Sequence, residues 1–161
     1  KNFSSMSWVY SCGAGANYGT ALESALKMGE TIHIPSCCYE IEEYIHGPNL
    51  QLTPQYNVIF FDGNDGASRR VEQVYKATRK VTNRAYLISN NPQLSRDGHV
   101  LSLSDTVSSE LSPLVYLPFV QLLSFIVSND LHSIYQHPLL KEFKAIAAAK
   151  TEYFVNFDGE D

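Results

Sequence analysis

The feature that most restricts the fold is an apolar run near the middle of the chain, Asn57-Val-Ile-Phe-Phe61. Consecutive apolar residues, rather than alternating ones, are typical of a strand buried on both faces, as strands are in parallel sheets. The run ends in the turn-forming sequence Asp-Gly-Asn-Asp-Gly at residues 62–66. A helix is predicted next, over residues 67–80, with Val71 and Val74 on its inner side.

Strands and helices alternate along the rest of the chain. Further strands are predicted at residues 8–10, 84–88 and 100–103, and residues 32–39 are predicted to form a short strand or an extended link. Helical patterns follow the first strand and the last one. This alternation predicts an α/β fold, a three-layer α/β/α sandwich around a parallel, flavodoxin-like sheet with helices on both faces.

The last of these helices is strongly apolar. Ser108 or Ser109 is the predicted N-cap, and residues 114–127 are apolar nearly all round, so the helix is expected to be buried or to lie in a subunit interface. No uninterrupted apolar run approaches the roughly 20 residues of a membrane span, and no signal peptide opens the sequence. We therefore expect no membrane partner.

The composition is that of one globular domain over residues 1–161, with 44% apolar and 18% charged residues. A formal net charge of −5 disfavours nonspecific binding of nucleic acid. The three cysteines, of which Cys37 and Cys38 are adjacent, do not form a disulfide framework or match a zinc signature. We expect buried thiols, no metal and a cytoplasmic location.

A Gly-rich turn and an amphipathic helix follow the first strand. The turn contains Gly13 and Gly15. One face of the helix is expected to be buried, and the residues at its spacing are Ala21, Leu22, Ala25 and Leu26. The other face carries Glu23, Lys27 and Glu30 at positions i, i+4 and i+7, so the three side chains line one side.

Sixteen residues after Glu30 comes His46, directly before Gly47-Pro48. Spacing alone favours a solvated Glu23–Lys27 pair of ~0.3–0.5 kcal/mol. With His46 counted, a carboxylate, an ammonium and an imidazole are expected near the carboxyl end of a strand. These are groups that proton transfer on a sugar requires. The combination therefore favours a chemical role.

These residues resemble a known family. The segment from Cys12 to Thr31 resembles the second sugar isomerase (SIS) domain of glucosamine-6-phosphate synthase and its relatives. Glu43-Tyr-Ile-His46-Gly-Pro is similar to that family's Gly-Glu-x-(Lys/Arg)-His-Gly-Pro loop, although Glu42 replaces the usual Gly and Ile45 a basic residue. The Gly63-Asn-Asp loop is similar to that of fructosamine-6-phosphate deglycases, a subgroup of the family.

The resemblance implies an aldose–ketose isomerase or a deglycase that acts on an amino-sugar or fructosamine 6-phosphate, moving a proton between C1 and C2 without a cofactor. Glu30 is the implied base, and His46 shuttles a proton. The implied third catalytic residue is Lys150, in a C-terminal tail over residues 137–161. The implied substrate-binding residues are Gly13, Gly15, Glu23 and Lys27, of which the last two also orient Glu30.

The resembled enzymes carry two such domains in tandem, and this chain is expected to be the C-terminal half. A Ser/Thr-rich phosphate loop has no good copy here, since Ser102 to Thr106 is interpreted as a strand end and turn. The resemblance also implies a homodimer in which His46 reaches the neighbouring subunit's site. Two alternatives remain open: a noncatalytic sensor of sugar phosphates, or a dimerisation module that uses the apolar helix.

Overall fold

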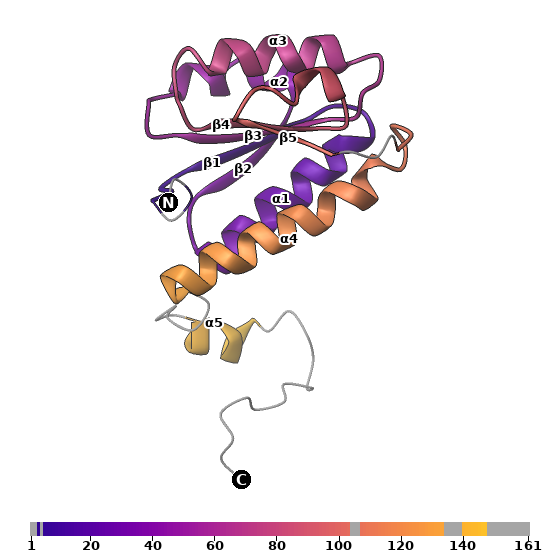
Figure 1. Ribbon diagram of the computed structural model, residues 1–161. Coiled ribbons are helices and arrows are strands. Elements are labelled where there is room, and N and C mark those ends of the chain that lie inside the picture. The colour runs from indigo at the N-terminus through magenta and orange to yellow at the C-terminus, as the bar shows by residue number, and fades with distance from the viewer. Residues whose placement is uncertain (1–2, 4, 104–106, 134–139, 148–161) are drawn as a thin grey trace.

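The computed structural model describes residues 3, 5–103, 107–133 and 140–147. A five-stranded parallel sheet lies between two layers of helices (Figure 1). The order across the sheet is β2-β1-β3-β4-β5, so the apolar run predicted to be central is the middle strand. The strands are β1 (Val9–Gly13), β2 (Ser36–Glu40), β3 (Asn57–Asp62), β4 (Ala85–Ser89) and β5 (Val100–Ser102).

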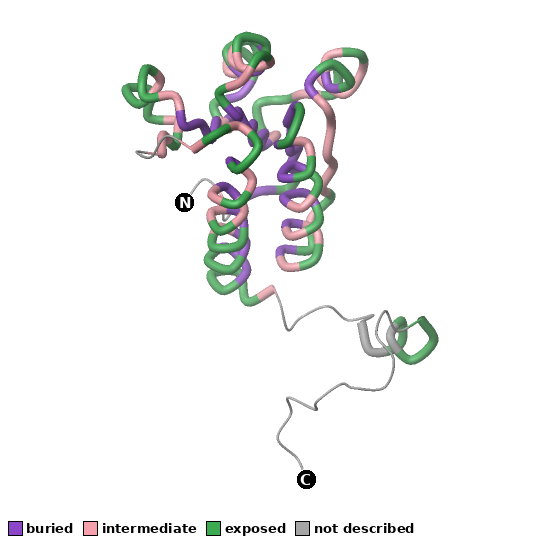
Figure 2. Tube along the Cα trace, turned by 90° about the vertical axis from the view of Figure 1, so that its right-hand side faces the viewer, coloured by how far each residue is buried: buried purple, intermediate pink, exposed green. Residues whose placement is uncertain are grey.

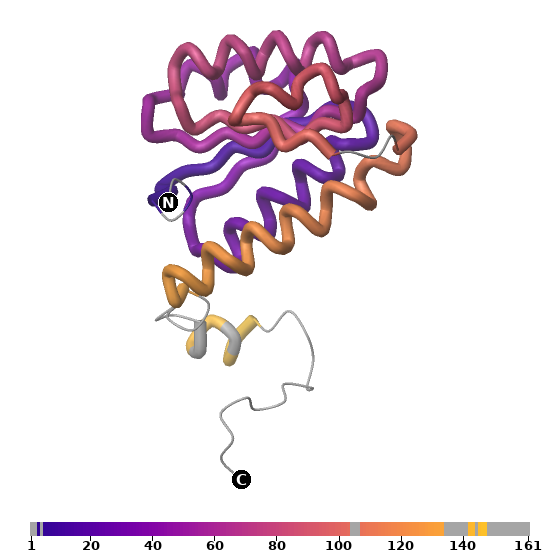
Figure 3. Tube along the Cα trace, in the orientation of Figure 1, coloured from indigo at the N-terminus to yellow at the C-terminus, as the bar shows by residue number. Residues whose placement is uncertain are grey.

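Helices cover both faces of the sheet, which confirms the three-layer prediction. One face packs against α1 and α4, which lie side by side, and the other packs against α2 and α3 (Figures 1 and 3). The α-helices are α1 (Ala16–Ile32), α2 (Ile41–Ile45), α3 (Ser68–Thr78), α4 (Ser112–Leu131) and α5 (Leu140–Ile146). Two 3₁₀ turns, η1 (Pro48–Gln51) and η2 (Pro92–Leu94), complete the described elements.

Packing on both faces of the central strand β3 explains why apolar and polar residues do not alternate in its sequence. Val58 and Phe60 pack into the core under α2 and α3, whereas Ile59 and Phe61 pack into the core under α1 and α4. All four side chains are at most 1% exposed. Each face of the strand therefore contributes to its own hydrophobic core.

The predicted buried face of α1 is partly wrong. Ala21 and Ala25 are buried, but Leu22 and Leu26 are 48% and 52% exposed. Small and polar side chains, among them Ser24, are buried in their place, and the Ser24 hydroxyl lies 2.9 Å from the Ser11 hydroxyl on β1. Small side chains suit this side of the helix, because α1 packs against both the sheet and α4.

The predicted N-cap of the last helix is also wrong. The helix α4 begins at Ser112 and has no side-chain cap. The backbone carbonyls of Ser108 and Ser109 instead accept hydrogen bonds from the Ser112 amide and hydroxyl. Both serines also help to hold the pKa of Glu110 below its usual value, after the larger effect of a backbone hydrogen bond at Glu110 itself. These serines therefore belong to the turn before the helix.

Only one side of α4 is buried. Tyr116 and Val120 lie in the core, whereas Leu114, Leu122 and Phe125 are 68%, 56% and 61% exposed. Exposed positions continue along the helix up to the grey trace that follows it (Figure 2). By length and composition alone α4 could cross a membrane, but core helices of globular proteins share these properties. The inner side of α4 packs into the core of this domain, as in such core helices.

Candidate functional site

The first predicted site element is the glycine turn at the carboxyl edge of the sheet. A Cβ at Gly13 would lie 2.3 Å from the backbone oxygen of Asn17, so only glycine allows the strand end to approach the helix this closely. Gly15 has a φ of +54°, in the left-handed region that favours glycine. Both residues are therefore explained by the turn that starts α1.

A second loop meets this turn at the same edge. The Asp62 carboxylate, which is fully buried, accepts hydrogen bonds from the Ser89 hydroxyl at 2.7 Å, from the Asn64 amide at 3.0 Å and from the Ser68 hydroxyl. A Cβ at Gly63 would lie 2.9 Å from the side-chain nitrogen Nδ2 of Asn17. This network joins the ends of β3 and β4, and its carboxylate is already well supplied with donors.

The predicted charged ladder forms on α1. Lys27 Nζ lies 2.8 Å from Glu30 Oε2 and 3.5 Å from Glu23 Oε1. The hydrogen bond to Glu30 is the main cause that raises the pKa of Lys27. Lys27 is therefore a cation that holds the Glu30 carboxylate in place, while Glu30 remains exposed to solvent.

His46 ends the short helix α2. That helix starts with a capping box in which Glu40 and Glu43 bond to each other's backbone amides. The His46 Nδ1 lies 2.6 Å from the Glu42 carbonyl oxygen. Because a carbonyl can only accept, Nδ1 carries a proton and Nε2 is the nitrogen left for proton transfer. The acidic segment before His46 thus forms a short helix.

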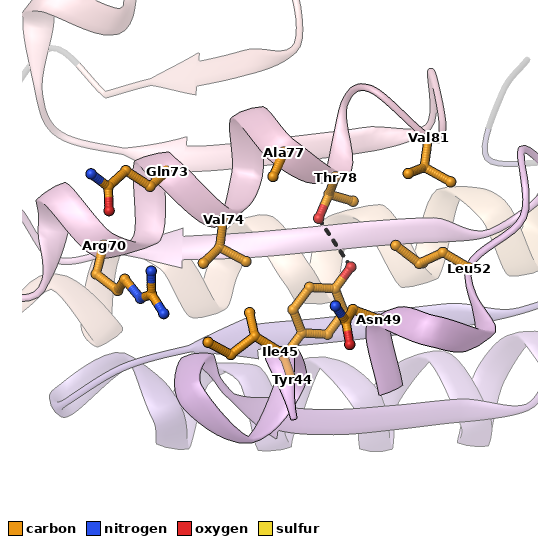
Figure 4. A pocket seen from close by; sticks show the side chains of 10 residues that line it. All are labelled: Tyr44, Ile45, Asn49, Leu52, Arg70, Gln73, Val74, Ala77, Thr78 and Val81. Atoms are coloured by element: carbon orange, nitrogen blue, oxygen red, sulfur yellow. Dashed lines mark hydrogen bonds between the residues drawn. The ribbon is translucent and has the colours of Figure 1, made fainter. Parts of the chain in front are cut away.

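Two contacts hold α2 against α3. The Glu42 carboxylate accepts two hydrogen bonds from Arg70, at 2.7 and 3.1 Å, which lowers the pKa of Glu42. The Tyr44 hydroxyl lies 3.0 Å from the Thr78 hydroxyl (Figure 4). Glu42, which departs from the family's glycine, therefore has a structural role. A pocket of about 290 Å³ lies beside these residues and contains none of the predicted site residues.

The predicted residues do not all meet within one chain, which corrects the expectation of a single site at the carboxyl edge. Glu30 lies in the last turn of α1, about 22 Å along the helix from Gly15 at 1.5 Å per residue. His46 ends α2, a helix that packs on the opposite face of the sheet. The helix α1 starts at the carboxyl edge of the sheet and runs back along the strands. Its last residues therefore lie at the amino edge.

Glu30 instead opens onto a groove between α1 and the edge strand β2. The groove has a volume of about 580 Å³ and is lined by Leu22, Ala25, Leu26, Gly29, Glu30, Ser36 and Cys38. Ser36 and Cys38 were not predicted as site residues. The sequence does contain a hint of their position. Alternate residues of a strand face the same side of the sheet, so Ser36 and Cys38 both point towards α1.

Several expectations concern residues that the structure does not describe. Lys150, most of the predicted tail over residues 137–161, and residues 104–106 are not described. Within the described part of the chain, no group of three or more His, Cys, Asp or Glu side chains could hold a metal ion. The three cysteines are free thiols, and burial raises the pKa of Cys38 to about 12.

Comparison with known proteins agrees with this fold. Residues 3–113 match the SIS domain. Over 131 residues the chain is 30% identical to a glutamine–fructose-6-phosphate aminotransferase (isomerizing) of Methanothermobacter thermautotrophicus, covering 79% of this chain and 22% of that protein. The corresponding protein of Xylella fastidiosa strain Temecula1 is 28% identical over 125 residues, which is 76% of this chain and 20% of that protein.

Solved structures show the same architecture. The tagatose-6-phosphate ketose/aldose isomerase of Escherichia coli superimposes with a TM-score of 0.71 at 18% identity, covering 81% of this chain and 38% of that one. The C-terminal domain of the glucosamine-fructose-6-phosphate aminotransferase of Francisella tularensis gives 0.68 at 24% identity, with 80% and 37% covered. The chain thus spans about a fifth of the length of the curated relatives it matches. With the SIS match over more than half of its residues, the chain belongs to the SIS domain family.

Proposed function

We propose that this domain is the catalytic half of an enzyme that moves a proton between C1 and C2 of a hexose or amino-ketose 6-phosphate. The observation that carries the proposal is the Glu23–Lys27–Glu30 ladder, which places a held carboxylate on an open groove. Fructose 6-phosphate is named in the relatives, and the phosphosugar-isomerase type of the family agrees with this chemistry. Glu30 is the base in the proposal.

His46 supplies the second proton-transfer group. With its proton on Nδ1, the imidazole can accept a proton at Nε2 from the substrate and then return that proton from Nε2 to the ring oxygen or the amine of the substrate. Since Glu30 and His46 belong to opposite faces of one sheet, the pair meets only if a second chain brings its own His46 to the Glu30 groove. The proposal therefore includes a homodimer with composite sites.

In the proposal, the chemical steps use these residues and the substrate, with water as a co-reactant in the deglycase case. After ring opening, the Glu30 carboxylate removes the proton on the carbon next to the carbonyl, and an enediol or enolamine forms. Return of the proton to the neighbouring carbon completes an isomerisation. In a deglycase, return of the proton to C2 of the enolamine would leave an imine at C1, and a water molecule would add to C1 and release the amine. Lys27 keeps Glu30 oriented during both steps.

Substitution of Glu30 tests this proposal in the protein that carries the domain. Glu30→Gln should reduce turnover of fructose 6-phosphate or of a fructosamine 6-phosphate by ~10²–10⁴-fold, the usual contribution of a general base. Glu72→Gln is the matched control, because Glu72 makes a similar 2.9 Å ion pair with Lys76 on α3. Full activity of Glu30→Gln with either substrate would overturn the assignment of the base.

One observation favours a second candidate, a noncatalytic module that associates through α4. The outer side of that helix exposes Leu114, Leu122 and Phe125. Phe125→Asp should then change the oligomeric state measured by light scattering, whereas Leu50→Asp, at an 86% exposed position on η1, should not. If this candidate is right, Glu30→Gln should change neither turnover of the sugar phosphates nor the oligomeric state.

A further inference from the structure

Arg70 connects the helix α3 to the helix that carries His46. Its Nε and Nη2 atoms lie 2.7 and 3.1 Å from the two carboxylate oxygens of Glu42. Glu42 is in the first turn of α2, and His46 is the C-cap residue of the same helix. A bidentate pair fixes orientation as well as distance, because both groups are planar. Arg70 therefore restrains the first turn of α2 from a different element of the fold.

Glu42 also fixes the position of the proton on His46. The Glu42 backbone carbonyl oxygen lies 2.6 Å from His46 Nδ1. Which nitrogen of an imidazole carries the proton is set by the hydrogen bonds that the ring makes. A shift of Glu42 would break this hydrogen bond and leave both tautomers accessible. The side chain and the carbonyl of Glu42 thus link Arg70 to the Nε2 atom of His46.

The other end of this link is held to the sheet. Arg70 lies in the first turn of α3, which begins at Ser68. The Ser68 hydroxyl donates to the buried Asp62 carboxylate and accepts from the Asp65 amide at 2.7 Å. Asp62 is the last residue of the central strand β3. Arg70 therefore projects from a rigid element, as a residue that supports a functional side chain should.

We propose that Arg70 is a positioning residue for His46: through Glu42, it holds the imidazole as the Nδ1–H tautomer and leaves Nε2 available for proton transfer. This inference rests on the proposed function for the use that is made of Nε2, but the position of the proton can be measured without turnover. Glycine, the family's usual residue at position 42, cannot make the contact with Arg70.

A positioning role and general stabilisation predict different results. The side chains of Arg70 and Glu42 are 45% and 53% exposed. Ion pairs as exposed as this one contribute little to stability, so Arg70→Ala should change the urea unfolding midpoint only slightly. The same substitution should change the tautomer of His46, because the carbonyl of Glu42 is no longer held in place.

The test is ¹⁵N NMR of the His46 ring in the 161-residue chain. The spectrum is recorded at about pH 8.5, where an ordinary imidazole is neutral, and His46→Gln identifies the signals. The native chain should show mainly the Nδ1–H form. Arg70→Ala and Glu42→Ala should each lower the ratio of the Nδ1–H to the Nε2–H form by ~2- to 10-fold, the effect of losing about one hydrogen bond. The exchanged pair Glu42→Arg with Arg70→Glu should restore most of this ratio.

Lys76→Ala is the matched control. Lys76 makes a 2.9 Å ion pair with Glu72 on the same helix. Its removal changes the charge of α3 by the same amount as Arg70→Ala, but the pair that is lost does not involve α2. Lys76→Ala should therefore leave the His46 tautomers as they are in the native chain.

The outcomes separate this inference from the proposed function. A lowered ratio in both single variants, with a native unfolding midpoint and recovery in the exchanged pair, supports the positioning role whether or not turnover is observed. The role is overturned by an unchanged ratio in Arg70→Ala, by a native ring that is mainly Nε2–H, by an equal loss in Lys76→Ala, by a loss that follows the unfolding midpoint, or by no recovery in the exchanged pair. Turnover that is insensitive to His46→Gln, in the protein that carries the domain, would instead overturn the part of His46 in the proposed function and leave the measured link to Arg70 in place.

Discussion

The most informative stability prediction concerns Tyr44, the side chain that anchors α2 under His46. A helix of five residues is too short to be stable alone, so the position of α2 depends on its packing. The Tyr44 ring packs edge-on against Phe60, with centroids 5.8 Å apart, and its hydroxyl lies 3.0 Å from that of Thr78. Tyr44 and Thr78 are 1% and 3% exposed.

Tyr44→Phe keeps the ring and removes only the hydroxyl. The buried hydrogen bond and the unpaired Thr78 hydroxyl left behind should together cost ~1–2 kcal/mol of unfolding free energy. For a domain of this size, that corresponds to a decrease in Tm of roughly 2–8 °C. The measurement is urea unfolding followed by circular dichroism. Tyr18→Phe, at a half-exposed position on α1, is the control and should stay within about 0.5 kcal/mol.

A double-mutant cycle with Thr78→Val tests the pairing itself. If the two hydroxyls bond to each other, the double variant should be more stable than the sum of the single losses predicts, by ~1 kcal/mol. Additive losses would show that the two side chains act independently. A change below about 0.3 kcal/mol for Tyr44→Phe alone would also refute the reasoning, because a buried hydrogen bond is worth more than that.

Two further predictions concern the turn and the groove. Gly13→Ala should destabilise the domain by ~1–3 kcal/mol or more in the same urea assay, because its Cβ would lie 2.3 Å from the Asn17 oxygen, whereas Gly19→Ala should be neutral or stabilising. Since burial raises the pKa of Cys38 to about 12, thiolate formation needs a higher pH than in an ordinary thiol. Alkylation of Cys38 should therefore still accelerate between about pH 9 and 11, where free glutathione levels off, and a plateau near pH 9 would contradict its burial.

Much of the fold could be predicted from local patterns. The apolar run Asn57–Phe61 indicated a central strand because a strand between two helical layers needs apolar residues at every position. The inner side of α3 was predicted for a related reason, since Val71 and Val74 recur at the helical period and are buried. Both predictions depend only on periodicity and burial.

The errors have a common physical cause. Leucine spacing suggested that Leu22 and Leu26 face inward, but close packing of α1 against α4 favours small side chains, so the leucines lie beside β2. Sequence spacing also aligned Glu23, Lys27 and Glu30 on the helix, but it did not show which end of the sheet Glu30 reaches or that Glu30 lines a groove together with Leu22 and Leu26. An unpaired hydroxyl such as that of Ser36, which has no hydrogen-bond partner among the described residues, depends on contacts between segments, which no local pattern reports.

The central claim is that Glu30 and His46 act together only between two chains. Glu30→Gln and His46→Ala should each be nearly inactive alone. Mixing them under subunit exchange should restore about a quarter of wild-type activity, because half of the dimers are mixed and one of the two sites in each has both native groups. No recovery, with exchange confirmed by native mass spectrometry, would contradict the claim.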